Sequence, residues 1–142
     1  MSLQRSIMRL NAATNGALRI LMFCREDRPL TMPDMTRKLG LTEALVIKTC
    51  NELMQAGVLV GQRGRGGGYR LARPASSIGA LEIIDLFEAK QTLFPCHVGE
   101  TGECRILPVC KLRRACEKAH AAFRGALEML TVADLALDTE QA

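Results

Sequence analysis

Three cysteines in one irregular stretch of the chain have the residue type and spacing of a metal site. Cys96, Cys104 and Cys110 follow a Cys-x7-Cys-x5-Cys pattern, in or beside a stretch interrupted by prolines and glycines. Thiolates crowded together repel one another unless a cation neutralises them, and soft sulfur ligands favour zinc or iron–sulfur clusters. Cys110 also stands at the expected start of a helix, whose positive end favours a thiolate. The pattern therefore predicts a site for a metal or a cluster.

The remaining cysteines are typical of packing rather than of ligation. The chain has six cysteines and no secretory signal, which favours metal or redox chemistry over a disulfide framework. Cys24, Cys50 and Cys116 fall at apolar positions of expected helices, where a thiol behaves as a small hydrophobe. The spacing of the other three does not match paired CxxC zinc ligands, so zinc is compatible with it but not indicated. His97, beside Cys96, is either a further ligand or a solvated loop residue.

A second group of residues has the chemistry of a polyanion-binding surface. The stretch from 61 to 68 is glycine-rich and carries Arg63 and Arg65 on either side of Gly64. Glycine lets a backbone approach a phosphate, and arginine inserts into a narrow minor groove. Residues 1–74 contain 12 Lys and Arg against five Asp and Glu, whereas residues 75–142 contain seven against ten. A nucleotide-binding loop is less well supported, because the Lys-Ser/Thr ending of a P-loop is missing.

These residues need a scaffold, and the periodicity predicts a winged helix-turn-helix. Apolar residues at helical spacing predict a helix over 11–25. Thr31 and Gly40 bound a second helix over 32–39, and Thr42 caps a third over 43–56. Short strands at 58–60 and 69–71 then enclose the arginine-bearing tip as a β-hairpin, the wing. If the third helix enters a DNA groove, its first turns present Thr42, Glu43, Ala44 and Lys48 to bases and phosphates.

The second half of the chain predicts two more helices. Ser77 is a candidate cap for a helix over 78–89, and residues 90–108 show no period. An a/d heptad seam then runs from position 109 to 130. A long helix with such a seam favours a homodimer, although packing on the chain's own body is the alternative. The seam consists of Val109, Leu112, Cys116, Ala119, Phe123, Ala126 and Leu130.

The composition limits the class of protein. A fold that is mainly α is expected to divide into a DNA-binding domain over 1–89, a cysteine loop over 90–110 and a dimerisation helix with its tail over 108–137. No apolar run approaches the roughly 20 residues of a membrane span, so we expect a cytoplasmic protein without a membrane partner. An enzyme is not expected, because two histidines and no paired carboxylates or nucleophile–base pair offer little acid–base chemistry.

Taken together, these segments resemble the Rrf-two family of winged-helix transcription regulators over about residues 8–137. The resemblance rests on the three cysteines and on MRL at 8–10, ALR at 17–19, AGVL at 56–59 and RGRGGGYRLA at 63–72. It implies a dimeric repressor that binds double-stranded operator DNA. The implied contacts are Arg9, Thr42, Glu43, Ala44, Lys48, Arg63, Gly64, Arg65, Gly66 and Gly67.

The resemblance also implies that Cys96, Cys104 and Cys110 bind an iron–sulfur cluster, with 4Fe-4S favoured over 2Fe-2S. The histidine of IscR-like members is replaced by Arg113, and the aspartate of some NsrR-like members is replaced by Asn15, a poor candidate for a fourth ligand. TNGA at 14–17 and TVADL at 131–135 are similar to the iron-responsive RirA-type members. The expected function is therefore an iron-sensing repressor. A nitric-oxide sensor of NsrR type and a zinc-stabilised protein-interaction module are the alternatives.

Overall fold

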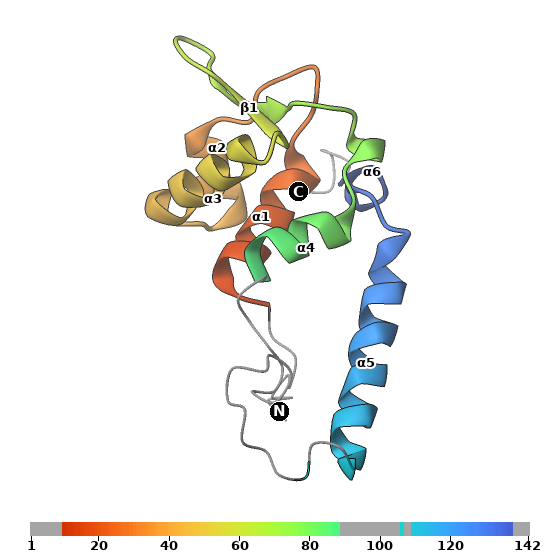
Figure 1. Cartoon of the computed structure of the whole chain (residues 1–142). Coiled ribbons are helices and arrows are strands. Elements are labelled where there is room, and N and C mark those ends of the chain that lie inside the picture. Colours follow the sequence, from red (N-terminus) through yellow and green to blue (C-terminus); the bar gives the residue numbers. More distant parts are fainter. Residues whose placement is uncertain (1–9, 89–105, 107–108, 138–142) are drawn as a thin grey trace, which may run out of the picture.

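The computed structural model describes residues 10–88, 106 and 109–137, and these residues form a mainly helical protein with one antiparallel hairpin. This confirms the predicted fold class of a winged helix-turn-helix followed by a long helix (Figure 1). The elements are α1 (Ala12–Phe23), α2 (Met32–Leu39), α3 (Glu43–Gln55), β1 (Leu59–Gln62), β2 (Gly68–Leu71), the 3-10 turn η1 (Ala75–Ser77), α4 (Ala80–Glu88), α5 (Lys111–Glu128) and α6 (Val132–Leu135).

Local signals set the helix-turn-helix. Thr31 caps α2 by accepting a hydrogen bond from the Asp34 amide, and α2 ends at Gly40, which adopts the left-handed conformation with φ 63°. Thr42 caps α3 in the same way, because its hydroxyl accepts from the Leu45 amide at 3.3 Å. The three predicted boundaries are therefore confirmed, and the turn between the helices is only residues 40–42 long.

The wing is a short hairpin that a third segment supports. β1 and β2 pair with Leu59 opposite Leu71 and Gln62 opposite Gly68. Alongside β2, Leu30 adds an isolated bridge, in which Leu30 and Tyr69 exchange backbone hydrogen bonds of 2.7 and 2.9 Å. The segment before α2 thus fixes the angle of the wing to the helix-turn-helix.

One apolar core joins these elements. Helices α1, α2, α3 and α4 contribute most of its largest fully buried side chains, Val58 and Ile78 come from connecting segments, and α6 adds Val132. The core consists of Ala17, Ile20, Leu21, Cys24, Met35, Leu39, Leu41, Val46, Cys50, Leu53, Val58, Leu59, Leu71, Ile78, Ile83 and Val132.

The start of α4 differs from the prediction. Ser77 does not cap it, because Ala75–Ser77 form a 3-10 turn and the helix begins only at Ala80. Between them the chain is extended: Gly79 forms a bridge with Thr131, and the Ala80 amide donates to the Leu130 carbonyl at 2.8 Å. The cause is tertiary, since Ile78 is fully buried and its carbonyl accepts from the Val132 amide.

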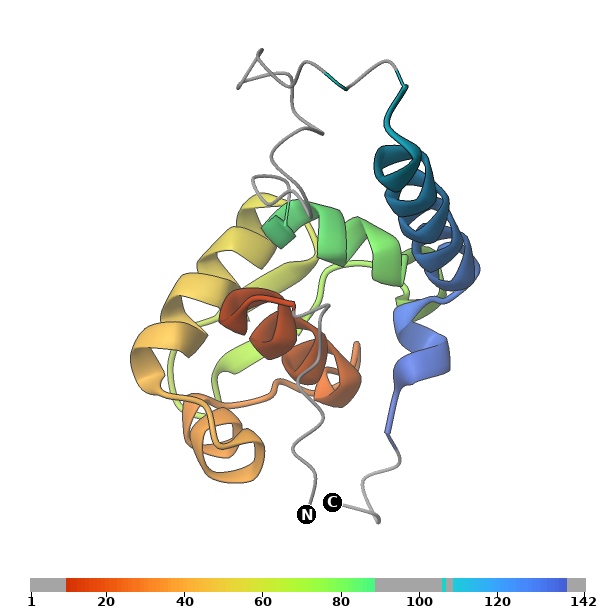
Figure 2. The same ribbon diagram turned by 90° about the horizontal axis from the view of Figure 1, so that it is seen from below.

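Helix α5 lies apart from the core. It begins two residues later and ends two residues earlier than the predicted 109–130 segment, and none of its residues is buried. Its main contact is α4, where Arg124 forms a bidentate ion pair with Asp85 at 2.5 and 2.8 Å. Figures 1 and 2 show α3 and α5 on opposite sides of α1 and α4. Within the described residues, no helix is long and apolar enough to cross a membrane.

Candidate nucleic-acid interface

The helical spacing of apolar residues in α3 decides which of its faces is exposed to solvent. Val46, Thr49, Cys50 and Leu53 face the core and are fully buried. The opposite face exposes the predicted contact residues Thr42, Glu43, Ala44 and Lys48, together with Ile47 and Asn51. Burial of one face therefore leaves the other free along about three turns.

The wing tip is shaped by its glycines. The Gly67 amide donates to the Gly64 carbonyl at 3.0 Å, which closes a four-residue turn with Arg65 and Gly66 at its centre. Gly66 has φ 76° and Arg65 has a negative φ, the backbone combination of a type II turn. Arg63 and Arg65 consequently stand exposed on either side of Gly64, as predicted.

The glycines of the wing are required for two different reasons. A Cβ on Gly64 or Gly66 would meet nothing within 4 Å, so only their positive φ values call for glycine. A Cβ on Gly67 would lie 2.3 Å from the Gln62 carbonyl oxygen, and one on Gly68 would lie 2.5 Å from the Leu30 carbonyl oxygen. Glycine at 67 and 68 is therefore required by the hairpin and by the Leu30 bridge.

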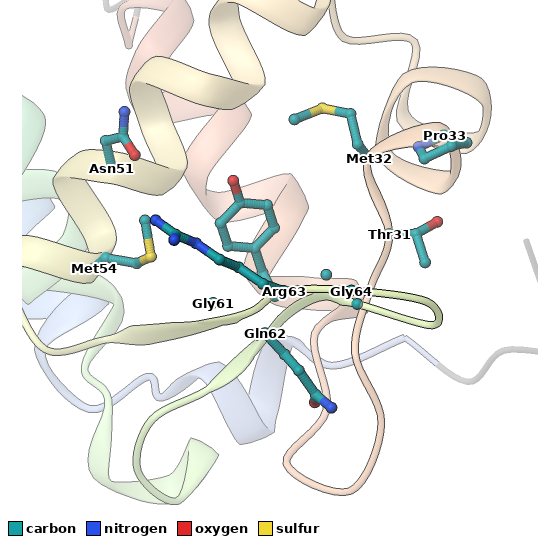
Figure 3. Close-up of a pocket in the computed structure, with 12 residues that line it drawn as sticks. Thr31, Met32, Pro33, Asn51, Met54, Gly61, Gln62, Arg63 and Gly64 are labelled. Atoms are coloured by element: carbon teal, nitrogen blue, oxygen red, sulfur yellow. The ribbon is translucent and has the colours of Figure 1, made fainter.

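A groove of about 640 Å³ separates α3 from the wing and the start of α2. Asn51 and Met54 of α3 form one wall, Thr31 and Pro33 at the start of α2 form another, and Arg63 belongs to the wing side (Figure 3). The second half of α3 and Arg63 of the wing thus border one groove. The exposed residues at the start of α3 and Arg65 lie outside its lining.

The surface has uncompensated positive charge. Among the described residues, Lys48, Arg63 and Arg65 take part in no ion pair, whereas Arg37, Arg73, Arg113 and Arg124 each have a carboxylate partner. Glu43 is the acidic exception at the first turn of α3. A groove bordered by the free Arg63 guanidinium, together with exposed Arg65, Lys48 and the exposed N-terminus of α3, suits the phosphates and groove edges of a nucleic acid.

The predicted cysteine ligands are only partly described. Arg9, Cys96 and Cys104 lie outside the described residues. Cys110 is the residue before α5, where it is half-buried and its Sγ accepts a hydrogen bond from the Arg113 amide at 3.4 Å. Its predicted place at a helix N-terminus is confirmed. Within the described part of the chain, no three His, Cys, Asp or Glu side chains come together as a metal site.

Asn15, the suggested fourth ligand, is exposed on α1. It lies close in sequence to a network that joins the start of α1 to the end of α4. There the Glu88 carboxylate accepts from the Asn11 amide at 2.7 Å and from the Thr14 hydroxyl at 2.5 Å, and the Asn11 side chain donates to the Phe87 carbonyl. The segment that carries Cys96 and Cys104 follows Glu88 directly in the sequence.

The other cysteines separate into two environments. Cys24 and Cys50 are buried in the core, and desolvation raises the pKa of each thiol to about 12. Neither thiol is ionised near neutral pH, which confirms their interpretation as packing residues. Cys116 is half-buried on α5.

Two residues of the exposed α3 face were missed by the sequence argument. Ile47 lies between the predicted contacts Ala44 and Lys48, and Asn51 lies one turn beyond Ile47. The prediction had considered only the first turns of the helix and its charged residue. The signal was available: both positions are out of phase with the buried Val46–Cys50–Leu53 set.

Comparisons with known proteins agree with this architecture. The family described as "Rrf2: Iron-dependent Transcriptional regulator" matches residues 10–138. The protein aau3 of Rhizobium meliloti is 34% identical over 130 residues, covering 90% of this chain and 84% of that protein. The HTH-type transcriptional regulator NsrR of Geobacillus kaustophilus is 33% identical over 134 residues, covering 92% and 91%.

Solved structures show the same fold. The oxidized form of Staphylococcus aureus CymR superposes with a TM-score of 0.71 at 21% identity, covering 93% of this chain and all of that one. T. potens IscR gives 0.69 at 22% identity, covering 90% and 85%. The family match spans nearly the whole chain and includes α3 and the wing, so the function is DNA-binding transcription regulation rather than catalysis: the chain belongs to the Rrf2 family of transcriptional regulators.

Proposed function

We propose that this protein is a homodimeric iron–sulfur repressor that binds operator DNA when loaded and reports on iron status. The observation that carries the DNA-binding part is the groove that Asn51, on the exposed face of α3, shares with Arg63 of the wing, together with the exposed side chains of Lys48 and Arg65. Its free positive charges have no carboxylate partners among the described residues, so they are available to phosphates.

We expect α3 and the wing to contact different parts of the DNA. The start of α3 enters the major groove, where Thr42, Glu43 and Ala44 approach base edges and Lys48 reaches a phosphate or a guanine edge. Arg63 and Arg65 reach the backbone or a narrow minor groove, because the wing projects beyond α3 (Figure 1). The backbone of Gly64, Gly66 and Gly67 follows the same turn, and Arg9 adds a further contact from the N-terminal segment.

The thiols of Cys96, Cys104 and Cys110 would hold the cluster, and 4Fe-4S is favoured over 2Fe-2S by the family resemblance. The described ligand fits this role: Cys110 is half-buried at the start of α5, and a backbone amide already donates to its sulfur. A bound cluster supplies a centre that iron shortage or oxidants can remove. Exposed Asn15 offers only a neutral amide as a fourth ligand, which would leave one iron exchangeable.

The dimer is proposed from the exposure of α5 and its flanks. Val109 and Leu112 of the seam are 72% and 62% exposed, Met129 beside the seam is 84% exposed, and α5 buries no residue within the chain. A second copy would cover this apolar seam. Because Cys110 precedes the first turn of α5, a ligated thiol would act on the element that sets the spacing of two α3 helices.

A nitric-oxide sensor is the second candidate, favoured by the 33% identity with a protein named NsrR. It would use the same dimer, cluster and DNA surface. The two candidates differ in which agent releases the protein from DNA: an iron chelator for the first, or nitric oxide at constant iron for the second.

The cluster is tested by anaerobic purification with iron and sulfide analysis. We expect a brown protein with visible absorbance, and alanine at Cys96, Cys104 or Cys110 abolishes both. Cys24→Ala and Cys50→Ala are the matched controls and retain the cluster. Full occupancy in Cys104→Ala would overturn the ligand assignment, and zinc in place of iron and sulfide would support the protein-interaction module.

DNA binding is tested by fluorescence anisotropy on duplexes selected from a randomised library. Arg65→Ala is expected to lower affinity about five- to a hundredfold and, if it contacts phosphate, to reduce the salt slope by about one. Lys118→Ala removes a positive charge from exposed α5 and serves as the control. Equal salt slopes and affinities for Arg65→Ala and wild type would remove the wing from the interface.

The dimer is tested by sedimentation across micromolar dilution. Leu112→Asp places a charge on a side chain that the chain itself leaves exposed, so monomer formation would reflect a lost intermolecular contact. An unchanged dimer would show that the seam is not the interface.

A further inference from the structure

Ile47 is a large apolar side chain on the solvent-exposed face of α3, among the residues expected to contact DNA. It lies in the middle of α3 and is 48% exposed. Among the described residues it is the only large apolar side chain that α3 exposes, since Val46 and Leu53 are fully buried. No core cluster includes it. An exposed β-branched residue on a helix also has lower helix propensity than Ala or Lys, so helix formation does not explain it.

The neighbours of Ile47 define a small apolar site within a basic surface. Ala44 lies one turn before it, Asn51 lies one turn after it, and Lys48 is adjacent, all exposed. The small side chain of Ala44 leaves room beside Ile47 for a group that projects from a partner. Because Lys48, Arg63 and Arg65 have no ion-pair partner among the described residues, we expect that partner to have a polyanionic backbone.

One apolar group satisfies both conditions. In the major groove of B-DNA, base edges present hydrogen-bond donors and acceptors, and the C5-methyl of thymine is the only aliphatic group. We propose that Ile47 is a specificity-determining residue that selects thymine by packing against this methyl, with Ala44 providing the space. The inference rests on the proposed DNA-binding role of α3 and adds the base that this position selects.

The magnitude follows from the size of the contact. Burial of one methyl group against an aliphatic side chain corresponds to roughly a three- to tenfold change in affinity. The preference should occur once in each half-site. It should also be insensitive to salt, because no ion is released on forming an apolar contact.

The test removes the methyl group without changing base pairing. Duplexes are selected from a randomised library with the full-length, cluster-loaded protein, and each thymine is then replaced singly by deoxyuridine. For wild type we expect a three- to tenfold loss at one thymine position per half-site. Ile47→Ala should bind thymine and deoxyuridine duplexes equally, with an affinity close to that of wild type for the deoxyuridine duplex.

Val60→Ala is the matched control. Val60 is also an exposed β-branched residue, at 39%, but it lies in β1 and borders a different groove with Glu26 and Arg70. This variant should keep the full preference for the methyl group. A control that loses the preference equally would overturn the assignment to Ile47.

The remaining outcomes distinguish the proposal from its foundation. If no duplex is enriched and none binds, the DNA-binding role of α3 fails. If duplexes bind but no thymine is sensitive, or Ile47→Ala retains the sensitivity, only the thymine assignment fails. A change of oligomeric state in Ile47→Ala by sedimentation would instead place Ile47 in a contact between copies, which also overturns the proposal.

Discussion

Replacement of Glu88 is expected to weaken the junction between α1 and α4. The Glu88 carboxylate accepts from the Asn11 amide and the Thr14 hydroxyl, and it lies at the positive end of α1. Asn11 and Glu88 are 77 residues apart in sequence, so this contact joins the start of α1 to the end of α4. Glu88→Ala removes the acceptor and leaves the hydroxyl of the fully buried Thr14 without its closest hydrogen-bond partner.

The magnitude can be worked from these contacts. The Asn11 amide loses a partly buried, charge-assisted hydrogen bond, which costs about 1–2 kcal/mol. Thr14 loses less, because its hydroxyl is also 3.1 Å from the Asn11 Oδ1. Loss of a negative charge at a helix N-terminus adds about 0.3–1 kcal/mol. We therefore expect Glu88→Ala to lower the free energy of unfolding by about 2–3 kcal/mol.

Urea unfolding followed by circular dichroism, at one fixed protein concentration, measures this difference. Glu88→Gln is the matched control: it retains an amide oxygen as acceptor and removes the charge, so about 1 kcal/mol of loss is expected. Equal stabilities of the two variants would show that the charge alone matters. A loss below about 0.5 kcal/mol for Glu88→Ala would refute the reasoning.

Three further outcomes follow from the structure. Gly67→Ala should disrupt the wing and lower DNA affinity more than tenfold, because its Cβ would meet the Gln62 carbonyl oxygen. The Cβ of Gly66→Ala would meet no atom, so this variant should cost only about 1–2 kcal/mol of backbone strain. Similar DNA affinities for the two variants in anisotropy titrations would contradict this. Burial raises the pKa of the Cys50 thiol from 9.0 to about 12, so the unfolded state releases a proton first and stability should fall as pH rises between these values, with a slope of up to about 1.4 kcal/mol per pH unit. Cys50→Ala should flatten that alkaline limb in urea titrations, and an unchanged limb would count against it. The hydrogen bond from Arg124 lowers the pKa of Asp85, so the stabilisation from this ion pair is present above the ordinary pKa of 3.8 and is lost as pH falls. Asp85→Asn should therefore make the loss of stability in acid less steep.

Much of the winged helix-turn-helix was determined by the sequence itself. Thr31, Gly40 and Thr42 bound α2 and α3 because caps act over three or four residues. The arginine-bearing tip formed a hairpin because glycines supply the positive φ values of its turn. The helical periods of α1 and α3 placed Cys24 and Cys50 in the core, as predicted. These are local choices of backbone and period, which neighbouring residues decide.

Other features depended on residues distant in the chain. Ser77 had the residue type of a cap, yet Ile78 and Gly79 are held extended against Thr131 and Val132, and α4 starts after them. Glycine at 68 is needed because the Leu30 backbone pairs alongside β2, which no local sequence pattern indicates. The position of Glu88 at the start of α1 likewise required the packing of α1 against α4.

The site shows the same division. Residue types identified the wing arginines and the first turn of α3, but only the tertiary structure brought Arg63 and Asn51 to one groove and left Ile47 exposed on α3. Exposure is a property of what the rest of the chain covers: an isoleucine in a helix is expected in the core until the packing of α1 and the hairpin on the other face of α3 leaves it outside. Sequence period gives the direction of each side chain, and packing decides which directions meet solvent.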